Sequence, residues 1–265
     1  MYEIAQKIRL HTLEMIDAAK ASHIGSCFSV VDLLAVLYFS ILKIDPSNPK
    51  EMKRDRCILS KGHAAAAMYA TLAERGFFPI ENLKTFCGYG SFLLGHLSHE
   101  IPGVECSTGS LGHGLSIGCG MALVEKRENM GYRTFVMISD GELNEGSIWE
   151  GVLFAAHHCL SKLMLIIDYN KIQSFGNTED IIGLEPLGKK FEAFNWDVSE
   201  IDGHDYAQIE KTLSVGGSGK PKVVIAHTVK GKGVSFMERE LKWHYKNPDA
   251  MQYSQAEREL CVQPS

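Results

Sequence analysis

Two apolar runs of the sequence end in polar residues whose types suit a hard metal ion. Asp140 follows the run 134–138, and Asn170 follows the run 163–167, thirty positions further along the chain. That spacing is enough for one crossover helix between adjacent parallel strands, so both polar ends can meet at the same edge of a sheet. A carboxylate, an amide oxygen and a nearby backbone carbonyl make half of the oxygen shell that Mg²⁺ completes with phosphate oxygens and water.

Gly141, directly after Asp140, would let a phosphate approach the backbone, and a helix that begins soon afterwards would offer free N–H groups. Taken singly, Asp140-Gly141 and Tyr169-Asn170 are more often ordinary turns. The combination of two buried strands, matching polar ends and a crossover-sized gap favours a metal–phosphate site.

The elements expected to position these residues alternate between strands and helices. We expect strands at 57–59, 134–138, 163–167, 196–201 and 223–226. We expect helices over 2–21, 30–42, 147–160 and 206–213, with Ser29 as the N-cap of the second. A further helix should follow His63 and end at a cap on Gly76, and another should begin at the later glycines of 88–120 and run to Asn129. This order predicts an α/β fold: one domain over 1–265, with a mainly parallel sheet and helices on both faces.

Composition narrows the possible functions. The chain has 265 residues, 45% hydrophobic and 22% charged, with a net charge of −5 and no basic stretch, which argues against nucleic-acid binding. No uninterrupted apolar run approaches the roughly 18 residues of a membrane span, and the N-terminus does not resemble a signal peptide. Seven cysteines without paired spacing fit a reduced, cytoplasmic protein.

A series of short segments, in chain order, resembles one known family. The sequence resembles the N-terminal, thiamine-diphosphate-binding domain of transketolase over nearly its whole length, and Asp140-Gly141 with Asn170 resembles the thiamine-diphosphate motif. The segments are Ser22-His23-Ile24-Gly25, Leu59-Ser60-Lys61-Gly62-His63-Ala64, Gly95-His96, Ser107-Thr108-Gly109-Ser110-Leu111-Gly112, Asp140-Gly141-Glu142 to Gly151, Lys230-Gly231-Lys232-Gly233 and Trp243-His244.

The resemblance implies roles for individual residues. It assigns Mg²⁺ (or Ca²⁺ or Mn²⁺) to Asp140, Asn170 and the main chain of Ile172. It assigns cofactor contacts to Ser26, His63, Gly109, Ser110, Leu111, Gly141, Asn170, Lys230 and His244, and to Glu145, at the place where family members use a glutamate to link two active sites. It places His63 and His244 at the reacting centre, and His23 and His96 at substrate hydroxyls. Two positions depart from the pattern: Ser139 stands in place of a glycine and His113 in place of a glutamine.

The resemblance further implies transfer of a two-carbon ketol unit from a ketose, or its phosphate, to an aldose. The pyrimidine-binding domain of the family is expected on a separate C-terminal subunit, in an α2β2 assembly without nucleic acid or membrane. Two alternatives stay open: a subunit of another thiamine-diphosphate enzyme, acting on an unusual sugar or in a deoxyxylulose-phosphate-synthase-like reaction, and a non-catalytic regulatory subunit.

Other residues that could do chemistry have simpler interpretations. Paired-ligand spacing is missing among Cys87, His96, His99, Cys106 and His113, so zinc is not expected. The glycines of 109–114 do not follow a strand with the spacing of a dinucleotide-binding loop. We expect ordinary surface or hydrogen-bonding roles for His11, His99, His157, His158 and His204.

Overall fold

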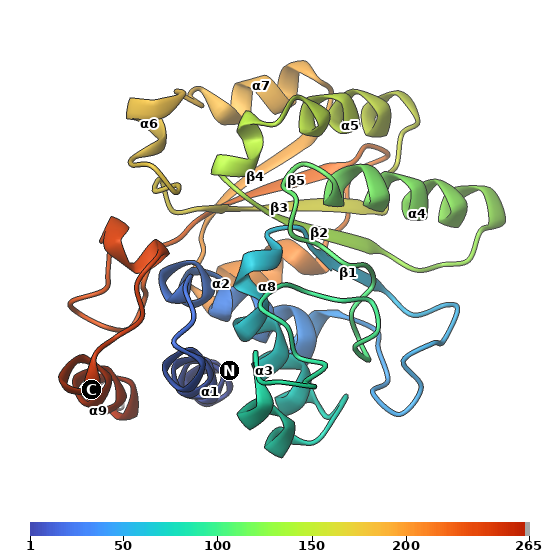
Figure 1. The fold of residues 1–265 in the computed structure, drawn as a ribbon. Helices are drawn as coiled ribbons and strands as arrows, with labels where there is room; N and C mark the ends of the chain where they lie inside the picture. The colour runs from blue at the N-terminus through green and yellow to red at the C-terminus, as the bar shows by residue number, and fades with distance from the viewer. Residues whose placement is uncertain (263–265) are drawn as a thin grey trace.

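A five-stranded parallel sheet forms the centre of the computed structural model, which describes residues 1–262 (Figure 1). The strand order is β1-β2-β3-β5-β4, and every neighbouring pair runs parallel. The strands are β1 (Arg56–Leu59), β2 (Thr134–Ser139), β3 (Leu163–Tyr169), β4 (Asp197–Asp202) and β5 (Lys222–His227). The predicted mainly parallel sheet is confirmed, and all five expected strands are present.

Helices cover both faces of the sheet, as predicted (Figure 1). One layer packs α1 (Tyr2–Ala19), α2 (Ile24–Val36), α3 (Ala65–Arg75), α8 (Tyr206–Ser214) and α9 (Ala250–Cys261) into one apolar core. The other layer contains α4 (Gly114–Glu128), α5 (Gly146–His157) and α7 (Leu187–Ala193), which enclose a second core. The short helix α6 (Thr178–Ile181), a π-helical turn Leu37–Ile41 and four 3-10 turns complete the helical segments of the described chain.

The two cores explain why the central strands are apolar along their whole length. All residues of β2 and β3 are buried. Alternate side chains enter opposite cores: Phe135 and Met137 of β2 lie in the first, and Val136 and Ile138 lie in the second. Polar residues are therefore costly within these strands, and they gather where the strands end.

The start of the second helix differs from the expectation. The expected N-cap Ser29 lies inside α2, which begins five residues earlier, at Ile24. His23, with φ 76° in the left-handed region, occupies the cap position, and the Ser29 hydroxyl donates instead to the buried Asp168 (2.7 Å). Helices α6, α7 and α9 were not expected; α9 begins with a capping box between Asp249 and Gln252.

Within residues 1–262 one helical stretch, Ile24–Ile41, has the length and apolar character of a membrane span. It is interrupted by the charged Asp32, and 89% of it is buried inside the fold. It therefore serves as the core helix between the sheet and helices α1 and α3, which both contact α2.

Candidate active site

A cleft of about 210 Å³ opens where β2, β3 and β5 end, and it gathers most of the residues singled out in the sequence. Its walls come from the start of α2, from the segment after β1, from loop 96–111 and from the 230–244 segment. The lining residues are His23, Ser26, Lys61, His63, His96, Gly109, Leu111, Ser139, Asp140, Gly141, Asn170, Ile172, Gln173, Ser174, Lys230 and His244. The predicted meeting of the two polar strand ends is thus observed.

Asp140, Asn170 and the Ile172 carbonyl present three oxygen donors to this cleft. Main-chain N–H groups orient the two side chains: Gly141 (2.7 Å) and Lys171 (2.6 Å) donate to the Asp140 carboxylate, and Ile172 donates to Asn170 Oδ1 (3.1 Å). Asp140 is 1% exposed, and burial together with the nearby Asp168 charge raises its pKa to about 6. A buried carboxylate beside amide and carbonyl oxygens fits a hard divalent cation, which would stabilise its charged form.

A buried ion pair supports the floor of the cleft. The Lys61 ammonium donates to Asp168 Oδ2 (2.6 Å) and to the Ser26 carbonyl (3.1 Å), and both charged side chains are at most 1% exposed. Asp168 also accepts hydrogen bonds from Ser29, Thr228 and the Asn170 amide. Burial raises the pKa of Asp168, but Lys61 and these donors outweigh it and hold the pKa below its usual value.

Three imidazoles form a compact cluster, and a fourth lies beside it. The His23 ring centroid lies 5.0 Å from that of His63, 5.1 Å from that of His244 and 6.4 Å from that of His96. The main-chain N–H of His23 donates to the main-chain carbonyl of His244 (3.0 Å), which holds the start of α2 against the 241–244 turn. Two segments more than two hundred residues apart thereby face the same space.

The cluster is electrically neutral at ordinary pH. Burial lowers the pKa of His23 to about 4 and that of His244 to about 3, with a further contribution from neighbouring cations. Burial and the Lys61 charge lower the pKa of His63 well below its usual value. A neutral imidazole has one ring nitrogen that donates and one that accepts, so it can hydrogen-bond hydroxyl groups of a bound molecule.

Lys230 is a buried cation, 1% exposed, between the metal donors and the imidazoles. Its ammonium donates to the Ile172 carbonyl (2.8 Å) and to His244 Nδ1 (2.9 Å). Burial, together with the Lys61 charge, lowers its pKa to about 8. Because Asp168 neutralises Lys61, Lys230 is the buried cation of this cleft that can attract an anionic ligand.

Glu142 holds the glycine-rich segment 109–114 against the rest of the site. Its fully buried carboxylate accepts hydrogen bonds from the Gly112 N–H (2.8 Å) and from the Ser60 hydroxyl, while Ser60 Oγ accepts from the Gly114 N–H (3.1 Å). A Cβ on Gly114 would lie 2.3 Å from Ser60 Oγ, so only glycine allows this approach. Sequence reasoning gave Glu142 no role of its own, although an acidic residue between buried segments was a visible signal.

Two predicted contacts do not line the cleft. Ser110 is exposed between the lining residues Gly109 and Leu111, and Glu145 is exposed at the start of α5. Conversely, Lys61, Gln173 and Ser174 line the cleft and Asp168 underlies it, although none received a role from the sequence. A lysine directly after β1 and an aspartate inside the apolar strand β3 were the signals available.

The two departures from the family pattern have different structural consequences. Ser139 accepts a hydrogen bond from the Glu142 N–H (3.3 Å), so its hydroxyl helps to close the turn after β2. His113 is exposed at the N-cap of α4, and its side chain makes no capping hydrogen bond.

Three of the histidines outside the cleft have side-chain hydrogen-bond partners. His204 is tied to the buried Asp32 (2.7 Å), which Arg9 and Tyr206 also contact, and its Nε2 accepts from the Val229 N–H (2.8 Å). His11 contacts Glu74 (3.0 Å), and His99 contacts Ser107 (2.9 Å). No cluster of three His, Cys, Asp or Glu side chains suited to a metal occurs in residues 1–262.

Comparison with known proteins gives the same family from sequence and from structure. Residues 2–265 match the family described as transketolase, thiamine diphosphate binding domain. The chain is 44% identical over 258 residues to an apulose-4-phosphate transketolase subunit of Phocaeicola vulgatus, covering 97% of this chain and 92% of that protein. It is 43% identical to the 6-deoxy-6-sulfo-D-fructose transketolase subunit SqwG of Clostridium sp. strain MSTE9, covering 91% and 88%.

Among solved structures, the transketolase from Leishmania mexicana superposes with a TM-score of 0.91 at 29% identity. That match covers 98% of this chain but 41% of the Leishmania chain, so the chain spans about two fifths of the length of that transketolase. By contrast, the relatives named as subunits have nearly its own length. The chain belongs to the transketolase family and corresponds to its thiamine-diphosphate-binding domain.

Proposed function

We propose that this chain is the cofactor-binding subunit of a two-component transketolase, which moves a two-carbon ketol unit from a ketose to an aldose. The observation that carries the proposal is the convergence, in one cleft, of three oxygen donors, two buried cations and four imidazoles. The oxygen donors and the cations suit a diphosphate group bound together with a divalent metal ion, and the imidazoles suit a polyhydroxylated substrate.

We assign a divalent cation, Mg²⁺ in the first place, to Asp140, Asn170 and the Ile172 carbonyl. Lys230 would face the diphosphate beside Gly141, together with main-chain N–H groups of the segment 109–111. Ser26, at the start of α2, and the imidazoles of His63 and His244 complete the proposed cofactor contacts. The support is the shared cleft and the buried, oriented Asp140 carboxylate.

When bound, thiamine diphosphate supplies the nucleophilic carbon and the electron sink that cleavage of a carbon–carbon bond requires. The chain's own part is proton transfer and orientation. We place His63 and His244 at the reacting carbon, and His23 and His96 at the hydroxyl groups of the sugar. Their lowered pKa values keep His23 and His244 neutral, so each ring can hydrogen-bond a hydroxyl group without carrying a charge.

The substrate class follows from the imidazoles and from the relatives. Neutral imidazoles hydrogen-bond hydroxyl groups in either direction, which suits a sugar chain. The similar subunits are named for apulose 4-phosphate and for 6-deoxy-6-sulfo-D-fructose, both sugars with an anionic end. We propose a sugar or sugar phosphate of this kind as substrate, with the anionic end held by the partner.

The partner we propose carries the pyrimidine-binding domain, in an assembly with two copies of each subunit. Exposed apolar side chains on neighbouring helices support contact between two copies of this chain: Ile117 and Val124 on α4, and Leu153 and Phe154 on α5. Glu145 lies at the start of the same α5, where a link between two active sites would pass.

We treat residues 1–265 as one cofactor-binding domain of a cytoplasmic enzyme. The five strands of the described part share one sheet, which supports the single domain. All seven cysteines are free thiols, which supports a reducing compartment.

Co-expression with the candidate second subunit tests the proposal. The pair should transfer ketol units from a panel of ketose donors to aldose acceptors when thiamine diphosphate and Mg²⁺ are supplied. The chain alone, shown free of a second subunit by mass spectrometry, should be inactive. Steady ketol transfer by the single chain would refute the two-component assignment, and decarboxylation of 2-oxo acids by the pair would favour another thiamine-diphosphate reaction.

The metal assignment has its own test. Asp140→Ala in the assembled enzyme should abolish Mg²⁺-dependent cofactor binding, because the diphosphate would lose an ion held by a buried carboxylate. Isothermal titration of thiamine diphosphate with and without Mg²⁺ measures this directly. Unchanged cofactor affinity would place the ion elsewhere.

A further inference from the structure

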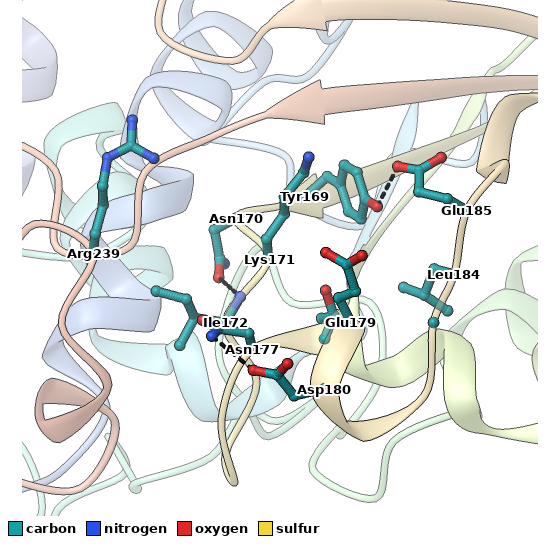
Figure 2. Close-up of a pocket in the computed structure, with 12 residues that line it drawn as sticks. Tyr169, Asn170, Lys171, Ile172, Asn177, Glu179, Asp180, Leu184, Glu185 and Arg239 are labelled. Atoms are coloured by element: carbon teal, nitrogen blue, oxygen red, sulfur yellow. Dashed lines mark hydrogen bonds between the residues drawn. The ribbon is translucent and has the colours of Figure 1, made fainter.

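Two further clefts lie beside the metal donors, outside the cofactor cleft. The first, about 510 Å³, lies between the end of β3 and the segment 177–185, and Figure 2 shows its lining. The second, about 580 Å³, lies between the ends of β3, β4 and β5 and the segment 228–239. The two clefts share Tyr169, Asn170, Lys171 and Arg239.

Two of the shared residues are cations without anionic partners. Lys171 and Arg239 are exposed, and within residues 1–262 neither side chain makes a hydrogen bond or an ion pair. In Figure 2 the Arg239 guanidinium points away from the acidic side chains of the first cleft, and the Lys171 ammonium lies 5.3 Å from the centre of the Tyr169 ring. Of the three carboxylates that line this cleft, Glu185 accepts from Tyr169 (2.6 Å) and Asp180 from Asn177 (2.9 Å), while Glu179 is exposed.

The second cleft carries an excess of positive charge. Lys171, Lys232 and Arg239 line it, against one carboxylate, that of Asp202. Asp202 already accepts a hydrogen bond from the His204 N–H (2.8 Å), and Lys232 lies 3.4 Å from Glu238. The cleft therefore favours binding of an anionic group beside the exposed side chains of Lys171 and Arg239.

Large apolar side chains are exposed on the same segment. Phe175 is 82% exposed and Ile182 is 56% exposed, and both lie between the metal donor Ile172 and helix α7. Exposed aromatic side chains and arginines are enriched among the residues that dominate protein–protein binding energies. A phosphate or another small anion would leave Phe175 and Ile182 in water.

This segment follows directly on the turn 170–172, which carries two of the proposed metal donors and is called the metal turn below. Lys171 has φ 66°, its N–H donates to the Asp140 carboxylate (2.6 Å), and its carbonyl accepts from the Thr178 N–H (3.0 Å). A group that binds the Lys171 side chain therefore acts on the residue whose main chain orients Asp140.

We propose that Lys171, Phe175, Ile182 and Arg239 form a docking surface for the second subunit, which presents one or more carboxylates beside an apolar socket. Docking at Lys171 would also fix the metal turn, so that assembly completes the cofactor site. The inference rests on the proposed two-component enzyme and adds to it the surface, the chemistry of the partner and the coupling to the metal donors.

Association kinetics test the charged part of the surface. The second subunit is immobilised, and binding of the full chain is followed by interferometry at low and high salt. Lys171→Glu and Arg239→Glu should each slow association about tenfold at low salt, and the difference should shrink at high salt. The matched control is Lys53→Glu, an exposed lysine that precedes the amino end of β1, at the opposite edge of the sheet.

Phe175→Ser tests the apolar part. Dissociation should become about thirtyfold faster with little dependence on salt, because the lost contact is apolar. Met52→Ser, at a methionine 65% exposed near the amino edge of the sheet, is the matched control and should leave dissociation unchanged. Circular dichroism of each variant establishes that it is folded.

The outcomes separate this inference from the function on which it rests. If the wild-type chain and the second subunit form no complex, the two-component assignment fails. If the wild type assembles and the folded variants at Lys171, Arg239 and Phe175 assemble equally well, the docking surface is wrong. If assembly is unaffected but the isolated chain binds inorganic phosphate and Arg239→Glu removes that binding, the site takes a small anion and the proposal is overturned.

Discussion

Replacing Lys61 with methionine should destabilise the fold far more than replacing an exposed lysine. The ammonium of Lys61 and the carboxylate of Asp168 are at most 1% exposed and 2.6 Å apart. Methionine keeps much of the apolar stem, so the change removes mainly the charge. Asp168 would keep its hydroxyl and amide donors but would lose its cation in a site that water does not reach.

The expected loss is about 3 kcal/mol in the free energy of unfolding, because removing one member of a buried pair costs about 3–5 kcal/mol and the remaining donors offset part of it. Urea denaturation followed by circular dichroism measures it. Lys53→Met, at an exposed lysine, should stay within about 0.5 kcal/mol of wild type.

A double-mutant cycle with Asp168→Asn shows whether the loss belongs to the pair. The double variant should be more stable than the sum of the two single losses predicts, by about 2 kcal/mol, since the neutral amide no longer needs the cation. Additive losses, or a Lys61→Met variant within about 1 kcal/mol of wild type, would refute the reasoning that the buried charge pair supports the floor of the cleft.

Three further expectations concern single residues. His96→Ala in the assembled enzyme should lower kcat or raise the KM of the donor while cofactor affinity stays nearly intact; equal loss of cofactor binding in a calorimetric titration would place His96 at the diphosphate instead. The His23 ring in the cofactor-free chain should titrate near pH 4 by NMR, because burial and neighbouring cations lower its pKa; a midpoint near the ordinary 6.5 would contradict that environment. Burial raises the pKa of Asp32, but the Arg9 charge and the hydrogen bonds from His204 and Arg9 outweigh it and hold the pKa below its ordinary 3.8. The stabilising contribution of this carboxylate is therefore full above pH 3.8 and is lost as the pH falls below it. The difference in unfolding free energy between wild type and Asp32→Asn, measured in urea, should narrow on acidification, and a difference that widens would contradict this.

The parts of the structure that sequence reasoning anticipated are those written in local patterns. The apolar runs that became β2 and β3 are bounded by polar residues at their ends, so strand type, direction and the meeting of Asp140 with Asn170 could all be expected. Gly76, with φ 96°, ends α3 as a glycine cap does in general.

The parts that were missed depend on distant partners. Ser29 reads locally as a helix cap, but its hydroxyl bonds to Asp168, 139 positions away, and the helix begins earlier. Lys61 and Asp168 are 107 positions apart, and no local pattern pairs them. Glu142 reaches Gly112 and Ser60 in the same manner. Such side chains are interpretable only after the fold has brought their partners together.

The strand order has a consequence for synthesis of the chain. Strand β4 is made before β5, yet within residues 1–262 β4 pairs only with β5, which lies between β3 and β4. While the ribosome is still adding residues before Lys222, β4 has no neighbour and the apolar edge of β3 stays open.

A nascent chain of that length exposes unpaired main-chain groups beside Leu165 and Ile167, which are fully buried in the finished fold. Such an edge is a template for pairing with another chain. The six residues of β5 complete the sheet by inserting between β3 and β4. Chaperone binding to ribosome-bound chains should therefore fall sharply once β5 has emerged from the ribosome.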